Sequence, residues 1–138
     1  MKYTYTATII PNKDDSKYFC RVPDLPGCIT TGDSIDNAIE MITDAASAWL
    51  VVAEDEGNMI PPASPQKNLK MPENAICTLI RVNTIAYRAA TDTKAVRKNV
   101  SLPAWMASLA EKRGLNCSQV LQDGLLSIFN NPQFSQMT

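Results

Sequence analysis

The chain has 138 residues, 45% of them hydrophobic and 20% charged, and its formal net charge is −1, so it is large enough to bury one core. Histidine is absent, and four cysteines lack C-x-x-C spacing, which disfavours a zinc site and most general-base enzymes. No apolar run approaches the roughly 20 residues of a membrane span, so we expect a cytoplasmic protein with no membrane partner, catalytic residue, cofactor or metal.

The first 82 residues predict the element order β-β-β-α-β. Residues 3–10 alternate between two faces and are rich in β-branched side chains, which indicates a strand. "KYFCRV" at 17–22 and "CITTG" at 28–32 predict two further strands. A helix follows from 35 and ends in "EDEG" (54–57), because its apolar residues recur every three or four positions. "AICTLIRV" at 75–82 predicts a strand buried on both faces.

The limits of that helix have recognisable signals. Asp33 or Ser34 can cap its start, and Gly57 is suited to the position after its end. Residues 58–74 contain four prolines and predict an irregular connection. The apolar stripe of the helix consists of Ile35, Ile39, Ile42, Ala46, Trp49 and Ala53.

The C-terminal part predicts a strand followed by two helices. Residues 83–94 suggest a short helix ending in a linker, and 95–102 an extended run. Pro103 suits the first turn of a helix over 103–113, and Gly114 stops it.

A second helix begins after Asn116, with Gln119 placed to complete a capping box. One strand and two helices can hardly bury an apolar face alone, so we expect this part to dimerise.

This order resembles the ribbon-helix-helix DNA-binding fold, in which strands of two chains pair and enter the major groove. Alternate residues of a strand face opposite sides, so Val96, Val100 and Leu102 would face the dimer core. The residues on the other side would face the bases, where arginine suits guanine and asparagine suits adenine. The expected base-contacting residues are Arg97, Asn99 and Ser101.

Phosphate contacts are expected from two places. Lys98 falls on the strand face that points to the dimer core, but its long side chain can extend to a phosphate. The start of the second helix offers free N–H groups. The expected phosphate-contacting residues are Lys94, Lys98, Asn116, Cys117 and Ser118. The alternative is that Arg97, Asn99 and Ser101 only form the solvent-exposed face of an edge strand.

Four further stretches carry a resemblance to the HicB antitoxin family over essentially the whole chain. They are "VPDLPGC" (22–28), "TTGDS" (30–34), "NAIEMITDAASAWL" (37–50) and "IPPASP" (60–65). The resemblance implies an α+β chain with a truncated RNase H-like domain and a ribbon-helix-helix module. The implied domains are 1–82 for toxin binding, 83–94 as linker, 95–130 for DNA binding and 131–138 as a flexible tail.

The same resemblance implies a HicA toxin as partner, a small basic ribonuclease that cleaves mRNA. The chain would occlude this toxin and, as a dimer on operator DNA, repress its own operon. It leaves open whether dimers pair further into tetramers. RNase H chemistry would need clustered carboxylates holding two metal ions, and the predicted strands place no acidic residue facing inward. We therefore expect binding rather than catalysis.

The proline-rich corner Val22–Cys28 has two interpretations. Each proline fixes φ and removes an N–H donor, so the corner is rigid before a partner arrives. It can be a preformed shelf that presents Asp24 and Leu25 to the toxin, or only a stiff crossover between strands.

Charge is distributed unevenly along the chain. Residues 1–83 hold eleven acidic and seven basic side chains, whereas 84–138 hold three acidic and six basic ones. Opposite signs suggest partners of opposite charge. A stand-alone ribbon-helix-helix repressor with a ligand-sensing N-terminal domain is the alternative, and it leaves the N-terminal charge without a partner.

Overall fold

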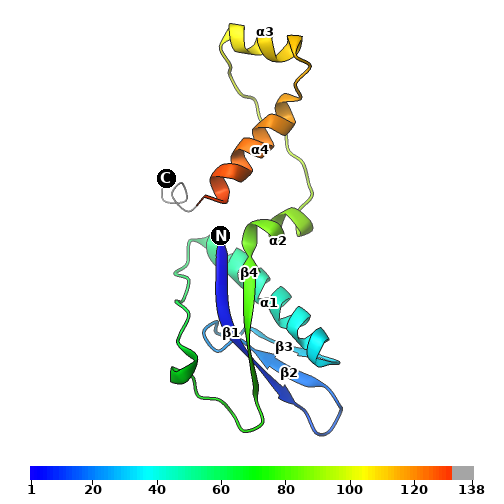
Figure 1. The fold of residues 1–138 in the computed structure, drawn as a ribbon, viewed down its shortest axis with the longest axis vertical. Coiled ribbons are helices and arrows are strands. Elements are labelled where there is room, and N and C mark those ends of the chain that lie inside the picture. The colour runs from blue at the N-terminus through cyan, green and yellow to red at the C-terminus, as the bar shows by residue number, and fades with distance from the viewer. Residues whose placement is uncertain (132–138) are drawn as a thin grey trace. The chain divides into compact units, whose positions relative to one another are not determined.

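The computed structural model describes residues 1–131, which contain four β-strands and four α-helices (Figure 1). They divide into two compact units, Lys2–Ala90 and the residues from Thr91 onward. This division falls inside the predicted linker 83–94. The predicted tail, 131–138, lies outside the described residues except for Asn131.

A four-stranded antiparallel sheet forms the first unit, in the order β3-β2-β1-β4. β1 (Lys2–Pro11) pairs with both β2 (Tyr18–Arg21) and β4 (Ile76–Asn83), while β3 (Ile29–Gly32) pairs with β2 at one edge. The predicted order β-β-β-α-β is therefore confirmed for this unit.

Helix α1 (Ile35–Glu56) lies along one face of this sheet (Figure 1). Ser34 caps it, because its side chain accepts a hydrogen bond from the Asn37 N–H at 3.0 Å. Gly32 permits its close approach to β3, since a Cβ atom at this position would lie 2.5 Å from the Ala38 Cα atom. Any side chain there would push the helix away from the strand.

The core lies between α1 and the inward face of the sheet. Alternate residues of β1 point into it, as the sequence predicted, and Ile42 and Leu50 of α1 are fully buried against them. Burying each large aliphatic side chain contributes roughly 1.5–3 kcal/mol. The buried hydrophobic residues are Tyr5, Ala7, Ile9, Cys20, Val22, Leu25, Cys28, Ala38, Ile42, Ala46, Leu50, Ala53, Ile80 and Val82.

The prediction that the last strand of the sheet is buried on both faces is wrong. Ile80 and Val82 point into the core, but Leu79 on the opposite face is 61% exposed. Phe19 and Ile29 share that opposite face and are also exposed. β4 is an edge strand, and its apolar composition did not reveal that only one face of the sheet carries the core.

A short helix, α2 (Thr84–Thr91), continues directly from β4 and is anchored on α1. The Arg88 guanidinium donates to the Glu54 carboxylate at 3.1 Å and lies 2.8 Å from that of Asp55. Glu54 also accepts hydrogen bonds from the hydroxyls of Tyr3 at 2.7 Å and Thr84 at 3.0 Å. Burial and this carboxylate raise the pKa of Tyr3. The structure thus adds α2 to the first unit.

The second unit contains α3 (Ala104–Lys112) and α4 (Cys117–Phe129). Asn116 caps α4 as predicted, and accepts from the Gln119 N–H at 3.2 Å. The reciprocal half of the predicted capping box is not formed, because the Gln119 side chain donates instead to Asp123, one turn later, at 2.9 Å.

Residues 92–103 contain no strand in the described single chain. The predicted strand 95–102 would pair only with its counterpart in a second copy, so it stays a prediction. Within the described part of this unit no large hydrophobic side chain is buried. The second unit therefore has no core of its own.

Candidate functional site

The proline-rich corner between β2 and β3 is closed by its own backbone hydrogen bonds. The N–H of Val22 donates to the carbonyl of Cys28, and the N–H of Leu25 donates back to the carbonyl of Val22, both at 3.1 Å. Gly27 takes a positive φ of 79°, which side-chain-bearing residues rarely adopt. Burial raises the pKa of the Cys28 thiol to about 11.

The side chains of this corner are also engaged within the unit. Leu25 is only 1% exposed and belongs to the core. Both carboxylate oxygens of Asp24 accept hydrogen bonds from Ser64, at 2.8 Å from its N–H and 2.7 Å from its hydroxyl. Trp49 of α1 donates to the carbonyl of Pro26 at 2.9 Å. This geometry favours the interpretation of a stiff crossover, and toxin binding by Asp24 and Leu25 stays a prediction.

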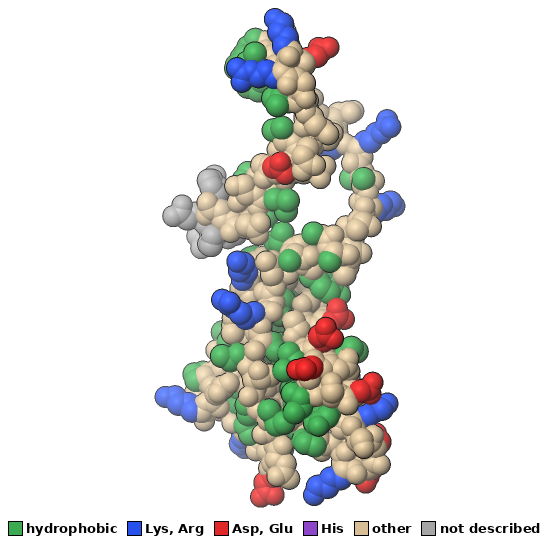
Figure 2. Space-filling view, turned by 45° about the vertical axis from the view of Figure 1, so that its right-hand side comes forward, with side chains coloured by type: hydrophobic (Ala, Val, Ile, Leu, Met, Phe, Trp, Pro, Cys, Tyr) green, Lys and Arg blue, Asp and Glu red, His purple; other side chains and the backbone are tan. Residues whose placement is uncertain are grey.

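The outward face of α1 carries acidic residues that, unlike Asp24, have no hydrogen-bond partner within the described chain. Asp36, Glu40 and Asp44 follow one another at intervals of four residues, so they lie in a row, and all three are exposed. They make no ion pair or hydrogen bond within the described chain, whereas Glu54 and Asp55 are engaged by Arg88. Figure 2 shows acidic side chains gathered over this helix. Like charges four residues apart destabilise a helix by roughly 0.2–0.5 kcal/mol per pair.

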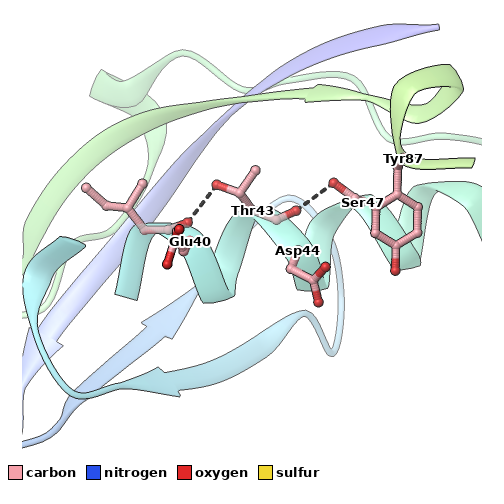
Figure 3. A pocket seen from close by; sticks show the side chains of 6 residues that line it. Glu40, Thr43, Asp44, Ser47 and Tyr87 are labelled. Atoms are coloured by element: carbon pink, nitrogen blue, oxygen red, sulfur yellow. Dashed lines mark hydrogen bonds between the residues drawn. The ribbon is translucent and has the colours of Figure 1, made fainter. Parts of the chain in front are cut away.

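Beside this row lies an open hollow between α1 and α2, with a volume of about 350 Å³. Figure 3 shows Tyr87 of α2 standing next to Ser47, with Thr43, Asp44 and Glu40 along the helix. The surface of the hollow is mostly apolar, and carboxylates border it. The lining residues are Ile39, Glu40, Thr43, Asp44, Ser47 and Tyr87.

Two of the three hydroxyl groups that line the hollow, those of Thr43 and Ser47, already donate hydrogen bonds to the main chain. Thr43 donates to the carbonyl of Ile39 at 2.6 Å, and Ser47 donates to the carbonyl of Thr43 at 2.7 Å (Figure 3). Their oxygens, like the carboxylates of Glu40 and Asp44, can therefore only accept further hydrogen bonds. The sequence analysis missed this hollow; the acidic row at four-residue spacing was a visible signal for it.

All of the predicted DNA-contacting residues are exposed. Arg97, Asn99 and Ser101 lie in the segment without regular structure, together with Lys94 and Lys98. The structure gives no contact among them, so their assignment to bases and phosphates stays a prediction.

The three residues predicted at the second helix lie at its N-terminus. Asn116 is the cap of α4, and Cys117 and Ser118 are its first two residues. Their contact with a phosphate stays a prediction.

The second unit exposes many large hydrophobic side chains. Val96 is 82% exposed, and Trp105 is 65% exposed. A folded chain rarely leaves so many apolar side chains in water without a partner. The others exposed in this unit are Val100, Leu102, Met106, Leu109, Leu115, Val120, Leu121, Leu125, Leu126, Ile128 and Phe129.

Two other classes of site find no support in residues 1–131. None of the helices there combines the length and apolar character needed to cross a membrane. No three acidic or cysteine side chains of this part come together in a geometry that could hold a metal ion.

The fold resembles solved antitoxin structures. A toxin–antitoxin complex from Streptococcus pneumoniae matches with a TM-score of 0.60 at 21% identity, covering 92% of this chain and 99% of that one. The antitoxin HicB of Burkholderia pseudomallei matches with a TM-score of 0.51 at 24% identity over 93% of this chain and 99% of that one. The N-terminal domain of that HicB matches at 25% identity with a TM-score of 0.52, over 59% of this chain and 99% of that one.

At the level of sequence, no curated protein matches the chain. A family model does match, over residues 5–121, and it describes the HicB-like antitoxin of bacterial toxin–antitoxin systems. This match includes the sheet, α1, α2, α3 and the start of α4, and thus most of both units. The chain belongs to the HicB-like antitoxin family.

Proposed function

We propose that the chain neutralises a HicA-type toxin, a small basic mRNA-cleaving ribonuclease, by binding it through the unit Lys2–Ala90 and covering its RNA-binding surface. The observation that carries this proposal is the row of exposed, unpaired carboxylates on α1. A basic RNA-binding surface is complementary to such a row. Occlusion of the toxin requires no reaction by the antitoxin itself.

Charge complementarity would act mainly on the association rate, while buried apolar contacts would supply most of the affinity. The resulting complex would keep the toxin away from mRNA for as long as the antitoxin remains bound. A cytoplasmic location follows from this role, since the toxin and its mRNA substrates meet there.

Co-expression tests this function directly. The small protein encoded beside this chain's gene should arrest growth when expressed alone, and the arrest should disappear when this chain is co-expressed. The two proteins should also co-purify as a stable complex. Continued arrest with both proteins present and soluble would refute the antitoxin role for this pair.

We also propose that the residues from 95 to 130 form a dimeric ribbon-helix-helix module that binds operator DNA and represses the operon. Two features support this: the exposed apolar side chains that a second copy would cover, and the excess of six basic over three acidic residues in 84–138. Basic charge attracts the DNA backbone, and base contacts by the ribbon would give specificity.

Replacing one expected base reader tests the DNA-binding role. Asn99→Ala should weaken operator binding by about 1–3 kcal/mol, since one bidentate base contact is lost. The matched control is Asn68→Ala, at an exposed position of the short 3-10 helix Gln66–Asn68 in the first unit. Both variants should neutralise toxin normally. Equal operator affinity for the two variants would contradict the assignment of Asn99.

A further inference from the structure

The hollow between α1 and α2 has the shape and chemistry of a receptor for one side chain. Its apolar surface comes from Ile39, the methyl group of Thr43 and the ring of Tyr87. Its polar groups are the carboxylates of Glu40 and Asp44, the helix-bonded hydroxyls of Thr43 and Ser47, and the hydroxyl of Tyr87. An occupant must therefore have an aliphatic or aromatic body and a polar end.

The hydrogen-bonding groups of the hollow select the sign of that polar end. The hydroxyls of Thr43 and Ser47 donate hydrogen bonds to main-chain carbonyls, and carboxylates only accept. The α1 side of the hollow thus offers only side-chain acceptors, while the Tyr87 hydroxyl of α2 can both donate and accept. Lysine has three N–H donors and arginine five, and neither has an acceptor.

Charge and aromaticity point to the same occupant. Glu40 and Asp44 are unpaired within the described chain, and Arg88, the cation of α2, is engaged by Glu54 and Asp55 instead. The Tyr87 ring adds a surface that attracts cations. A long basic side chain can lay its methylene groups on the apolar surface while its charge reaches the carboxylates.

We propose that this hollow receives a lysine or arginine side chain of the toxin and is the anchor point of the antitoxin–toxin interface. The proposal rests on the proposed function, because it assumes a basic protein partner. It places the contact on α1 and Tyr87, away from the proline-rich corner. Because Tyr87 belongs to α2, the occupant would touch the helix that leads into the second unit.

The test measures toxin affinity for the full chain and two charge-matched double variants. E40Q/D44N removes both carboxylates of the hollow but keeps its shape. D14N/E73Q removes one aspartate and one glutamate elsewhere, both exposed. The first variant should bind toxin about 10- to 100-fold more weakly, as expected when charged partners at an interface centre are lost. The control should stay within about threefold of wild type.

A third variant fills the hollow from within. Thr43→Arg places a guanidinium of the chain itself next to Glu40 and Asp44, and it should reduce toxin binding as strongly as E40Q/D44N. Unfolding midpoints close to wild type would show that each variant is folded. In a double-mutant cycle, one lysine or arginine of the toxin should lose its contribution when E40Q/D44N is present, which identifies the occupant.

Several outcomes would overturn the assignment. Equal weakening by both double variants would mean that only overall charge matters, and no weakening would mean that the hollow stays empty; in both cases the proposed function stands, because wild type binds. A change in the mass of E40Q/D44N without toxin, measured by light scattering, would assign the hollow to a second copy. Failure of the wild-type chain to bind toxin would overturn the proposed function itself.

Discussion

The unit Lys2–Ala90 and the region from Thr91 to Asn131 differ in how their apolar side chains are placed. The first buries them between one helix and one face of a sheet, inside a single chain. The second leaves them exposed at both of its helices. The proposed function gives this difference a use: the first unit is complete and would be ready for a partner protein, and the second would become complete only when two chains meet.

The largest expected effect is on the stability of the first unit, and it tests where the core of that unit lies. Leu50 is fully buried against the sheet, so Leu50→Ala should lower the free energy of unfolding of the first unit by about 2–5 kcal/mol. Urea denaturation followed by circular dichroism measures the loss. The control is Leu79→Ala, because Leu79 is 61% exposed, and it should change stability by less than about 0.5 kcal/mol. Similar losses for both leucines would place the core elsewhere.

The buried thiol of Cys28 should make the stability of the first unit depend on pH. Burial raises the pKa of Cys28 to about 11 from the value near 9 that it has when unfolded. The folded state therefore holds this proton more tightly. Its stabilising contribution is complete below pH 9 and is lost as the pH rises toward 11, by up to about 1.4 kcal/mol per pH unit.

Chemical unfolding at pH 8, 9, 10 and 11 measures this decline, and Cys28→Ala should make it less steep; the raised pKa values of Cys20, Tyr3 and Tyr5 cause the remainder. Cys117 is exposed at the start of α4, so a thiol reagent should modify Cys117 at once and Cys28 only after unfolding. Rapid modification of Cys28 in the folded protein would contradict its burial.

The secondary structure of the first unit was predictable because its signals are local. Alternation in residues 3–10 and the three-to-four spacing after Ile35 each follow from the geometry of one element. The number of layers that cover a sheet is not local. The run at 75–82 is apolar, but only the assembled sheet shows that Leu79 faces away from the core.

The candidate site was less predictable for the same reason. The hollow joins Tyr87 to side chains of α1 that precede it by 40 or more residues. The engagement of Asp24 by Ser64 also spans a separation of 40 residues. The motif predicted a rigid corner, yet it could not tell that Leu25 points inward. The exposure of a side chain depends on packing between segments that are distant in the sequence, and this packing is not visible in the local sequence pattern.

Dilution tests whether the core of the second unit forms between two chains. Folding of a unit whose core forms between two chains depends on concentration, and each tenfold dilution should reduce its stability by about 1.4 kcal/mol. Stability of the first unit should not change. The two tryptophans separate these signals, because Trp49 lies in α1 and Trp105 in α3.

Trp49→Phe leaves Trp105 as the fluorescence reporter of the second unit, and Trp105→Phe leaves Trp49 as that of the first. The Trp105 transition should move with protein concentration, while the Trp49 transition should stay fixed. A concentration-independent Trp105 transition would mean that the second unit folds within one chain, and the contrast between the two regions would disappear.

The smallest expected effect concerns the helix that ends the first unit. Arg88 joins α2 to α1 through Glu54 and Asp55, but its side chain is 35% exposed, so solvent weakens these ion pairs. Arg88→Met should cost the first unit about 1 kcal/mol. Arg81→Met is the control, since Arg81 is exposed on β4 and makes no ion pair among the described residues.

This small change has a larger consequence at the hollow. Without Arg88, Glu54 keeps only its neutral hydroxyl donors, and α2 should leave α1 more often, taking Tyr87 away from Glu40 and Asp44. Toxin affinity should then fall by more than the stability loss alone explains. Hydrogen exchange of the α2 amides measures this opening, and exchange as slow as in the Arg81 variant would show that the ion pairs do not hold the helix in place.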